Sequence, residues 1–302
     1  MKVLLTGSNG LLGQKLVQVL RADPAFDLLA TSRGGDRSAQ PLGPGYRTLD
    51  ITDAKAVDTI FDAFAPDVVI HTAAMTNVDA CELDPVACTL QNVTATENLL
   101  RAAERHDSHF IFLSTDFIFD GQAGPYKEDD VPAPLSTYGH SKLDGEKLVQ
   151  AAGLRKWAIA RTIIVYGHAA GLSRGNAVSW AKGALEKGEV MRVVDDQYRM
   201  PTLAEDLADG CIRIAKQGAT GIYHLSGPDG MTILELVQRV ATFFGLDPRH
   251  VQAVKSDSLG QPAKRPPVTG FILDKARREL GYAPRTFEQG LAVLQEQWST
   301  NI

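Results

Sequence analysis

Features that mark secreted, membrane and disulfide-bonded proteins are scarce in this chain of 302 residues. Its three cysteines, Cys81, Cys88 and Cys211, are few and odd in number, which argues against a disulfide framework and for a reducing compartment. No apolar run reaches the roughly 18 residues that a membrane-spanning helix needs. The first residues have the pattern of a strand rather than of a signal peptide. We therefore expect a cytoplasmic protein without a membrane partner.

An excess of positive charge is also missing. Lysine and arginine number 31 against 36 aspartate and glutamate residues, which gives a formal net charge of −5. Nucleic acid is therefore not an expected partner, because an acidic chain has no overall attraction for a polyanion. Cys81 and Cys88 stand seven residues apart with no histidine at ligand spacing, so no metal site is expected. The remaining composition is that of an ordinary globular protein, with 44% hydrophobic residues.

What the first half of the chain does contain is an alternation of short apolar runs with stretches of helical period. This alternation predicts parallel strands joined by crossover helices. Strands are expected at residues 2–6, 27–31, 46–49, 68–71, 110–114 and 157–163. Helices are expected at residues 11–21, 54–65, 84–106 and 137–152. The pattern indicates an α/β fold built on a doubly wound parallel Rossmann sheet.

A glycine-rich loop follows the first expected strand directly. Its sequence, Gly7-Ser8-Asn9-Gly10-Leu11-Leu12-Gly13, has the spacing G-x-x-G-x-x-G and opens into an amphipathic helix. The glycines permit a tight turn and let backbone N–H groups approach a pyrophosphate at the positive end of the helix dipole. Glycine-rich turns are common, but strand, loop and helix occur here in the order that dinucleotide binding requires. The expected cofactor contacts are Gly7, Asn9, Gly10, Leu11, Leu12 and Gly13.

The regular alternation loosens after Tyr166, where polar and glycine-rich segments separate shorter elements. Helices are expected at 176–187, 203–216, 232–244 and 287–297, and strands at 190–194 and 222–225. We interpret residues 1–165 as a dinucleotide-binding Rossmann domain. Residues 166–302 are interpreted as a smaller α/β part that mainly binds the substrate, with the helix near 203–216 returning to the first domain.

The end of the second expected strand bears on the choice of cofactor, because an acid there pairs with a ribose 2′-hydroxyl and repels a 2′-phosphate. The segment ends in Ser32 and Arg33 without an acid. A guanidinium suits a 2′-phosphate, which favours NADPH. Two alternatives stay open: Arg33 is a solvated surface residue, or Asp36 restores the binding of NADH.

Two residue pairs follow the third and fourth expected strands. Asp50 and Ile51 are placed to accept from an adenine amino group and to cover its ring, and Ala73 and Ala74 leave room for a ribose. Core packing explains both pairs equally well.

Tyr138 and Lys142 stand four residues apart, which places them on one face of the expected helix at 137–152. A phenol with a pKa of about 10 is a poor acid at neutral pH, and a nearby ammonium lowers that pKa. The spacing is common by chance, but here it follows a strand whose carboxyl end lies where ligands bind in such sheets. Thr115 follows that strand and is placed to bond a carbonyl oxygen of a substrate, with a turn or cap as its alternative role.

Together these residues resemble the extended short-chain dehydrogenases/reductases and, more narrowly, the dTDP-4-dehydrorhamnose reductase family. The resemblance covers nearly the whole chain and rests on five motifs. They are Ser114-Thr115-Asp116-Phe117-Ile118-Phe119-Asp120-Gly121, Asn77-Val78-Asp79-Ala80-Cys81-Glu82, Arg161-Thr162 before Tyr166-Gly167, Asp196-Gln197 before Pro201-Thr202, and Arg265-Pro266 before Leu273-Asp274-Lys275.

The resemblance implies an NAD(P)H-dependent oxidoreductase in which Thr115, Tyr138 and Lys142 form the catalytic set. Hydride would pass to C4 of a nucleotide-linked 4-keto-6-deoxy sugar, as in dTDP-rhamnose synthesis, while Tyr138 protonates the oxygen and Lys142 binds the nicotinamide ribose. The residues that it assigns to the substrate are Thr115, Asp116, Asn176, Gln197 and Arg265. The last three serve equally well as capping or loop residues.

The chain departs from the family pattern at two places. Some members pair through a metal ion held by a carboxylate two residues beyond the third glycine, where this chain has Lys15. The segment 197–201 carries bulky residues where the family more often has a small one. We expect a monomer or a homodimer. A face through Ala95, Leu99 and Ala102 supports either a dimer contact or core packing.

Two alternatives to the reductase stay open. An epimerase, a dehydratase or a reductase of another carbonyl would share the fold and the Tyr/Lys pair. A dehydratase is disfavoured because Phe117, not an acid, follows Asp116. The second alternative is a non-catalytic subunit that binds the dinucleotide and regulates a partner enzyme, although such a subunit has no need of Tyr138 and Lys142.

Overall fold

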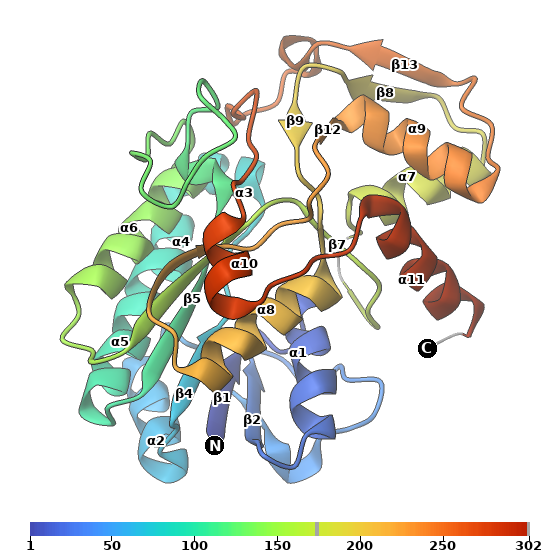
Figure 1. Cartoon of the computed structure of the whole chain (residues 1–302). Coiled ribbons are helices and arrows are strands. Elements are labelled where there is room, and N and C mark those ends of the chain that lie inside the picture. Colours follow the sequence, from blue (N-terminus) through green and yellow to red (C-terminus); the bar gives the residue numbers. More distant parts are fainter. Residues whose placement is uncertain (173–174, 301–302) are drawn as a thin grey trace.

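A seven-stranded parallel sheet forms the centre of the protein, whose computed structural model describes residues 1–172 and 175–300 (Figure 1). The strand order is β11-β6-β5-β4-β1-β2-β3. The strands are β1 (Lys2–Thr6), β2 (Asp27–Ser32), β3 (Tyr46–Thr48), β4 (Val68–His71), β5 (His109–Thr115), β6 (Trp157–Thr162) and β11 (Gly221–His224). The chain winds outward from β1 to β3 and then, on the other side, from β4 to β6. The expected doubly wound Rossmann sheet is thus confirmed.

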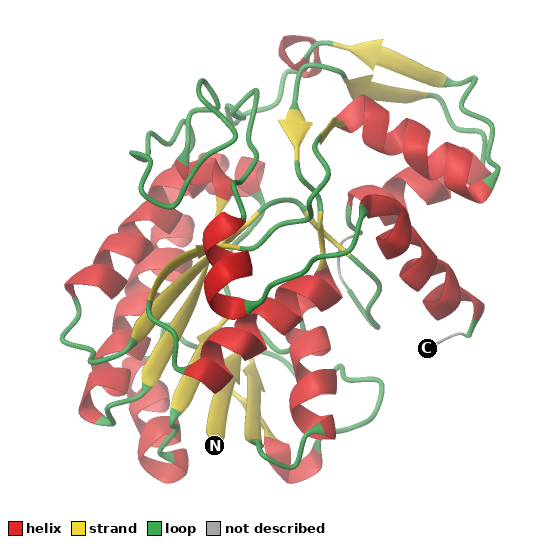
Figure 2. Cartoon of the chain, viewed as in Figure 1, coloured by secondary structure: helices red, strands yellow, loops and turns green. Residues whose placement is uncertain are grey.

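Helices cover both faces of this sheet (Figure 2). On one face, α1 (Leu11–Ala22) and α8 (Ala204–Gln217) pack together over the odd-numbered side chains of β1. On the other face, α2 (Ala54–Phe64), α5 (Ala95–Arg105) and α6 (Thr137–Ala151) cover the even-numbered side chains of β5. The helix α8 comes from the second half of the chain and packs against α1.

The rest of the second half forms a smaller unit beyond the carboxyl edge of the sheet (Figure 1). Its apolar core lies between α7 (Ala177–Glu186), α9 (Ile233–Phe244), α11 (Phe287–Ser299) and the paired strands β8 (Met191–Val194) and β13 (Val251–Val254). The remaining short elements are α3 (Val78–Leu83), α4 (Pro85–Thr89), α10 (Asp274–Leu280), η1 (Gly43–Gly45), η2 (Leu90–Thr94), η3 (Asp116–Ile118), η4 (Ser256–Leu259), β7 (Val165–Tyr166) paired with β10 (Thr202–Leu203), and β9 (Tyr198–Arg199) paired with β12 (Met231–Thr232).

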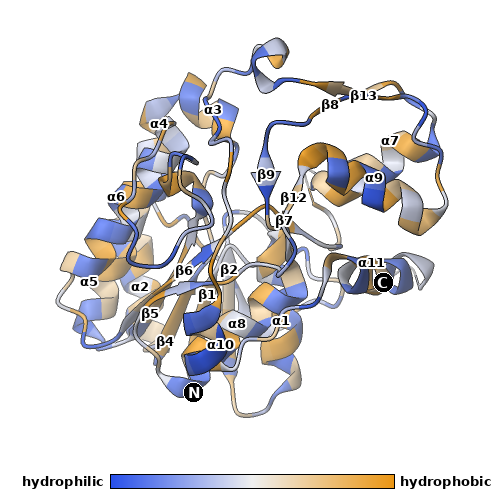
Figure 3. Ribbon diagram, turned by 45° about the horizontal axis from the view of Figure 1, so that its top comes forward, coloured by the Kyte–Doolittle hydropathy of each residue, from blue (hydrophilic) through white to orange (hydrophobic). Residues whose placement is uncertain are grey.

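Hydrophobic residues predominate along the strands of the central sheet, whereas the helices combine hydrophobic and hydrophilic residues (Figure 3). Val3, Leu4 and Leu5 are fully buried, as expected for a parallel strand that is covered on both faces. Ala95, Leu99 and Ala102 are also fully buried within the chain, so core packing accounts for them. Among the helices of residues 1–172 and 175–300, none combines the length and the apolar character needed to cross a membrane.

Most expected elements are found within one or two residues of their predicted ends, but the single helix expected at 84–106 is wrong. The segment consists of α4, the π-helical turn η2 and α5. The wider turn carries Asn92, whose buried side chain bonds both backbone groups of Met75. A π-turn inside a helix often marks a functional site, and here it joins α5 to the loop after β4.

Candidate active site

At two positions of the glycine loop after β1, a larger side chain would collide with the backbone of the chain itself. A Cβ atom at Gly7 would lie 2.7 Å from the backbone nitrogen of Ala73, and one at Gly13 would lie 2.2 Å from the carbonyl oxygen of Gly7. The φ angle of Gly7 is +76°, in the region that favours glycine. No side chain of the described residues caps the start of α1. The glycines thus permit the tight turn into α1, whose uncapped N-terminus can accept a pyrophosphate.

Asn9 ties this loop to the segment that follows β2. Its side chain donates to the carbonyl oxygen of Gly35 at 2.8 Å and accepts from the backbone N–H of Arg37 at 3.0 Å. Asp36 accepts from the backbone N–H groups of Ser38 and Leu42, at 2.9 and 2.7 Å. The carboxylate of Asp36 is thus used within its own loop.

The residues expected around the adenosine half lie as follows. Arg33 is exposed and Ser32 half-buried at the end of β2. Asp50 accepts from both the backbone and the hydroxyl of Thr52, which lowers the pKa of Asp50, with Arg33 contributing to that shift. Ile51 is 4% exposed in the core under α5, so packing accounts for it. Ala73 and Ala74 are half-buried and follow β4 beside the glycine loop.

Thr115 ends β5, and Tyr138 and Lys142 stand one turn apart on α6, which packs against that strand. They are 6%, 8% and 4% exposed. Phe117 lies edge-on to the ring of Tyr138, with centroids 5.8 Å apart. The Nζ atom of Lys142 lies 4.0 Å from the ring centroid of Phe112 and makes no hydrogen bond or ion pair with any described residue.

Burial shifts the pKa values of Tyr138 and Lys142 in the directions that favour the neutral form of each side chain. It raises the pKa of Tyr138, and the hydroxyl of Thr115 opposes that shift. It lowers the pKa of Lys142 to about 7, and the carboxylate of Glu146 opposes that shift. The expectation that Lys142 lowers the pKa of Tyr138 is thus outweighed, in the protein alone, by the loss of water around both groups.

Close packing of α6 on the sheet fixes this arrangement. Ser136 caps the helix by accepting from the backbone N–H of Gly139 at 3.2 Å. A Cβ atom at Gly139 would lie 2.3 Å from the carbonyl oxygen of Phe117, and one at Gly145 would lie 2.6 Å from the ring of Phe112. Only glycine at these two positions lets α6 approach β5 and the loop behind it so closely.

A buried ion pair lies one turn along α6 from Lys142. Glu146 is fully buried and accepts from Arg161 of β6 at 3.0 and 2.7 Å. The same guanidinium donates to the carbonyl oxygen of Glu128 at 3.1 Å and lies 3.4 Å from Nε2 of His224. The pair fastens the helix that carries Tyr138 and Lys142 to the sheet. Sequence reasoning missed its role, although an arginine inside the apolar strand 157–162 was a visible signal.

Asn92 is the second residue that sequence reasoning missed. Its amide nitrogen donates to the carbonyl oxygen of Met75 at 3.0 Å and to the hydroxyl of Ser141 at 2.9 Å, and its oxygen accepts from the N–H of Met75 at 2.7 Å. Ser141 stands between Tyr138 and Lys142 on α6. Asn92 therefore joins the loop after β4 to the helix of the Tyr/Lys pair. No signal in the sequence alone distinguished it from other helical asparagines.

The residues that the resemblance assigns to a substrate are engaged within the chain. Asp116 is 2% exposed next to Thr115, and Gln197 is 6% exposed near Arg199. Asn176 caps α7 and donates to the carbonyl oxygen of Gly167 at 2.7 Å.

Arg265 binds Asp79 of α3 through two N–H···O contacts of 3.1 and 2.7 Å. The arrangement brings Asp116 and Gln197 toward the same buried arginine, Arg199, and leaves Asn176 and Arg265 in separate contacts.

Lys15 and a cavity beside α1 lie apart from this site. Lys15 is 4% exposed and pairs with Glu205 of α8 at 2.9 Å, so its charge is used inside the chain. A cavity of about 390 Å³ lies between the outer face of α1 and residues 38–40, away from Tyr138. In the described part of the chain, no three His, Cys, Asp or Glu side chains gather around a point that a metal ion could occupy.

The fold is that of the extended short-chain dehydrogenases/reductases. More narrowly, the chain belongs to the dTDP-4-dehydrorhamnose reductase family, whose model, described as RmlD substrate binding domain, matches residues 1–299. The resemblance noted in the sequence is thereby confirmed.

Curated relatives of this chain include both reductases and a subunit. A probable low-salt glycan biosynthesis reductase of Haloferax volcanii is 31% identical, with 99% of each chain covered. A dTDP-4-dehydrorhamnose reductase of Aggregatibacter actinomycetemcomitans is also 31% identical, with 96% of this chain and 97% of the relative covered. The methionine adenosyltransferase 2 subunit beta of Mus musculus is 32% identical over 100% of this chain and 91% of its own length.

Solved structures of the family superpose over nearly the whole chain. A dTDP-4-dehydrorhamnose reductase of Clostridium acetobutylicum has a TM-score of 0.87 at 28% identity, with 99% of this chain and 100% of that chain covered. The enzyme of Bacillus anthracis, solved in complex with NADP, has a TM-score of 0.84 at 26% identity, with 98% and 99% covered.

Proposed function

We propose that this protein is an NADPH-dependent reductase of the 4-keto group of a nucleotide-linked 4-keto-6-deoxy sugar, of the kind reduced in dTDP-rhamnose synthesis. The observation that carries the proposal is the burial of Thr115 at the carboxyl end of β5 and of Tyr138 and Lys142 on the helix packed against it, in a fold whose glycine loop follows β1. Reductases among the relatives of the chain support the same reaction class.

The proposed roles follow from the chemistry of each group. The glycine loop, with Asn9 to Gly13, binds the pyrophosphate of the dinucleotide, which supplies the hydride when bound. Lys142 bonds the nicotinamide ribose, since its Nζ has no partner in the described chain. Tyr138 donates its proton to the carbonyl oxygen. The ammonium of Lys142 favours the phenolate that remains. The buried hydroxyl of Ser114 has no hydrogen-bond partner among the described residues, so it can form a further hydrogen bond beside the site.

The same proposal assigns a different ligand to each of the two parts of the chain. Residues 1–165 would bind the cofactor and residues 166–302 mainly the substrate, with Asp116, Asn176, Gln197 and Arg265 toward the sugar nucleotide. Arg265 reaches a diphosphate only by releasing Asp79, because its guanidinium is already paired. NADPH is favoured over NADH because Arg33 is exposed while the carboxylate of Asp36 is turned into its own loop.

The decisive experiment follows the absorbance of NADPH, and separately of NADH, after addition of dTDP-4-dehydrorhamnose to the purified protein. We expect oxidation that falls by at least about 10²-fold in Tyr138→Phe, the scale of a lost acid group, while the variant still binds cofactor. Unchanged turnover in that variant would contradict the assigned acid. Turnover of another keto sugar in place of this one would retain the reaction class and correct the substrate.

A second candidate function is a non-catalytic subunit that binds the dinucleotide. It is favoured by the relatives named methionine adenosyltransferase 2 subunit beta and by the paired state of Arg265. This candidate predicts tight cofactor binding without oxidation of NADPH by any sugar nucleotide. It also predicts that Tyr138→Phe binds the cofactor as the wild type does and has no turnover to lose.

A further inference from the structure

His71 is the last residue of β4, the middle strand of the central sheet, and both nitrogens of its ring have a hydrogen-bond partner. The residue is 2% exposed. Its Nδ1 atom lies 2.7 Å from the hydroxyl of Thr6, the last residue of β1. Its Nε2 atom lies 3.1 Å from the hydroxyl of Thr96 on α5. The imidazole therefore joins the strand that precedes the glycine loop to a helix on one face of the sheet.

The direction of these hydrogen bonds follows from the hydroxyl of Thr96. It donates its one hydrogen to the backbone carbonyl oxygen of Asn92 at 2.8 Å, so it can only accept from His71. The Nε2 atom of His71 therefore carries a hydrogen. Burial lowers the pKa of His71 to about 3, and the charge of Lys142 adds to that shift, so the ring is neutral near pH 7 and its Nδ1 atom carries no hydrogen. Nδ1 accordingly accepts the hydrogen of Thr6.

Each end of this chain of hydrogen bonds reaches a part of the candidate site. The hydroxyl oxygen of Thr6 accepts the backbone N–H of Ala73 at 3.4 Å. A Cβ atom at Gly7 would lie 2.7 Å from that same backbone nitrogen, so this end lies against the glycine loop. At the other end, the side chain of Asn92 donates to the hydroxyl of Ser141 at 2.9 Å, between the two members of the Tyr/Lys pair on α6. No hydrogen is used twice along the chain.

We propose that His71 is a positioning residue that fixes the glycine loop relative to the helix of the Tyr/Lys pair, through one hydrogen bond on each side. The inference rests on the proposed function, in which one dinucleotide spans both parts, with its pyrophosphate at the glycine loop and its nicotinamide ribose at Lys142. A displaced loop weakens the binding of the cofactor. A displaced helix misplaces the nicotinamide and slows hydride transfer.

Two pairs of variants cut the chain of hydrogen bonds on one side each. The amide of asparagine ends as many bonds from the backbone as Nδ1 of histidine, and the amide of glutamine ends as many as Nε2. His71→Asn therefore keeps the bond to Thr6 and loses the bond to Thr96, which Thr96→Val also removes. His71→Gln keeps the bond to Thr96 and loses the bond to Thr6, which Thr6→Val also removes.

The first test measures the dissociation constant of NADPH by fluorescence titration, and kcat with dTDP-4-dehydrorhamnose at saturating NADPH. We expect His71→Gln and Thr6→Val to raise the dissociation constant about tenfold and to keep kcat within about threefold of the wild type. We expect His71→Asn and Thr96→Val to lower kcat by about tenfold or more and to keep the dissociation constant within about threefold. His71→Asn combined with Thr96→Val should be no worse than either alone, because all three proteins lack the same bond.

A merely structural role of His71 would group the variants differently. The two His71 variants would then resemble each other, and kcat and the dissociation constant would change together. That grouping would overturn the inference, as would additive losses in the double variant. If the His71 variants fail to fold, the two threonine variants must still differ as stated. Thr31→Val is the matched control, because Thr31 lies beside Thr6 in the sheet and its buried hydroxyl donates to the carbonyl oxygen of Leu5 at 3.0 Å.

The second test needs no substrate. Long-range ¹H–¹⁵N spectra of the protein with ¹⁵N-labelled histidine show which ring nitrogen carries the hydrogen, and His71→Asn identifies the signals of His71. We expect the hydrogen on Nε2 at every pH from about 5 to about 9, a range that brackets the titration of an ordinary histidine. A hydrogen on Nδ1, or titration of His71 within this range, would overturn the inference.

A wild type without turnover would refute the proposed function rather than the inference. The fluorescence emission of the bound reduced nicotinamide then takes the place of kcat, because it responds to the surroundings of the ring. It should change in His71→Asn and Thr96→Val and stay as in the wild type in His71→Gln and Thr6→Val. The same emission in all four variants and the wild type would overturn the inference.

Discussion

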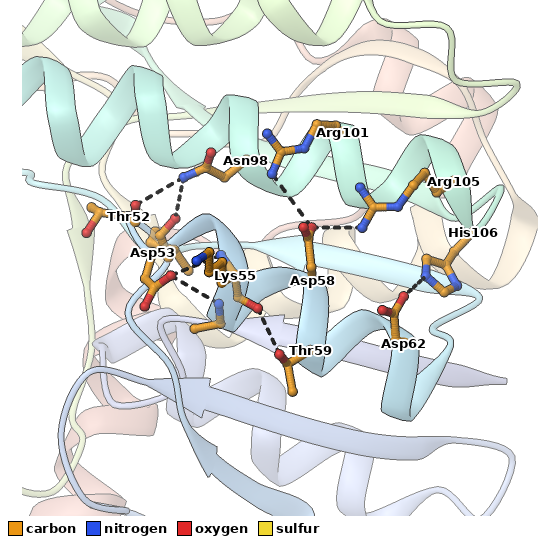
Figure 4. A network of polar contacts seen from close by, with 12 residues as sticks. Thr52, Asp53, Lys55, Asp58, Thr59, Asp62, Asn98, Arg101, Arg105 and His106 are labelled. Carbon is orange, nitrogen blue, oxygen red and sulfur yellow. Dashed lines mark hydrogen bonds and ion pairs between the residues drawn. The ribbon is translucent and has the colours of Figure 1, made fainter.

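Charged side chains occur in two contrasting settings in this protein, on the outer seam between α2 and α5 and beneath the candidate active site. In the seam, Asp58 accepts from Arg105 at 2.7 Å and lies 3.7 Å from Arg101 (Figure 4). The three side chains are 36% to 51% exposed. Beneath the site, Arg161 and Glu146 also approach to 2.7 Å, but they are only 3% and 1% exposed.

This comparison shows that the distance between two charges does not by itself determine how much an ion pair contributes to stability. Water and salt screen the seam, and its long side chains lose freedom when they pair. The buried pair has no water to replace a missing partner, so each charge depends on the other. The seam is thus a surface that tolerates change, whereas the buried charges fix the position of α6 and of the Tyr/Lys pair on it.

The largest effect is expected from breaking the buried pair. Glu146→Gln leaves the guanidinium of Arg161 without a counter-charge and should lower the free energy of unfolding by about 3–5 kcal/mol. Urea unfolding followed by circular dichroism measures this loss. The matched control is Glu146→Gln combined with Arg161→Met, which removes both charges and should recover much of the stability. A loss below about 1 kcal/mol in the single variant would mean that water reaches the pair.

The next largest effect is expected at Lys142, where replacing the side chain should raise rather than lower the free energy of unfolding. Its pKa of about 7 lies below its ordinary value of about 10.4, so between these values the folded protein holds fewer protons than the unfolded chain. Lys142 therefore costs stability in full below about pH 7, and stability recovers as pH rises toward 10. Lys142→Met should be more stable than the wild type by at least about 2 kcal/mol at pH 6.

The check is the difference in unfolding free energy between the two proteins across this pH range. Other titrating groups cancel in the difference, so the gap should close as pH rises from 7 to 10. The variant should also lose turnover while it gains stability, as expected of a functional group held in an unfavourable environment. A gap that does not change with pH would show that packing, not charge, separates the proteins.

Much of the fold could be predicted from the sequence because each strand of a covered parallel sheet is a short, continuous apolar run. Residues 2–6 and 68–71 are such runs, and glycine or polar residues bound them. The two-residue strands β7, β9, β10 and β12 were not predicted, since each exists only through a partner far along the chain. The π-turn at η2 was missed for a similar reason, because contacts of Asn92 with Met75 and Ser141 accompany it.

The candidate site could be predicted in its composition but not in its polar pairings. Thr115, Tyr138 and Lys142 follow from local spacing and from the strand that precedes them. The burial of Arg199 and its approach to Asp116 depend on the segment 266–269, which is distant in sequence. The pairing of Arg265 with Asp79 was equally invisible, because neither residue differs locally from a solvated charge.

The next prediction concerns the exposed charge of Arg33 and compares the binding of the two cofactors. Arg33→Ala should weaken the binding of NADPH about tenfold, the scale of one charge-assisted contact with a phosphate, and leave NADH nearly unchanged. Fluorescence titration with each dinucleotide measures both constants. Arg47→Ala is the control, since Arg47 is an exposed residue of β3 that donates only to nearby backbone oxygens of Pro44 and Tyr46. Equal losses for the two cofactors would remove the argument for the 2′-phosphate.

The smallest effect is expected in the seam itself. Asp58→Asn makes the same chemical change as Glu146→Gln, from carboxylate to amide, but at a position where water solvates the two arginines that lose their partner. The urea midpoint should therefore move too little to separate from the wild type, and any shift should vanish in high salt because salt already screens the pair. Turnover should be unchanged, since α2 carries none of the candidate site. The contrary outcome is that Asp58→Asn destabilises the protein as strongly as Glu146→Gln does. Burial would then not explain the difference between the two settings, and the charges that join α2 to α5 would have to act as one cooperative network.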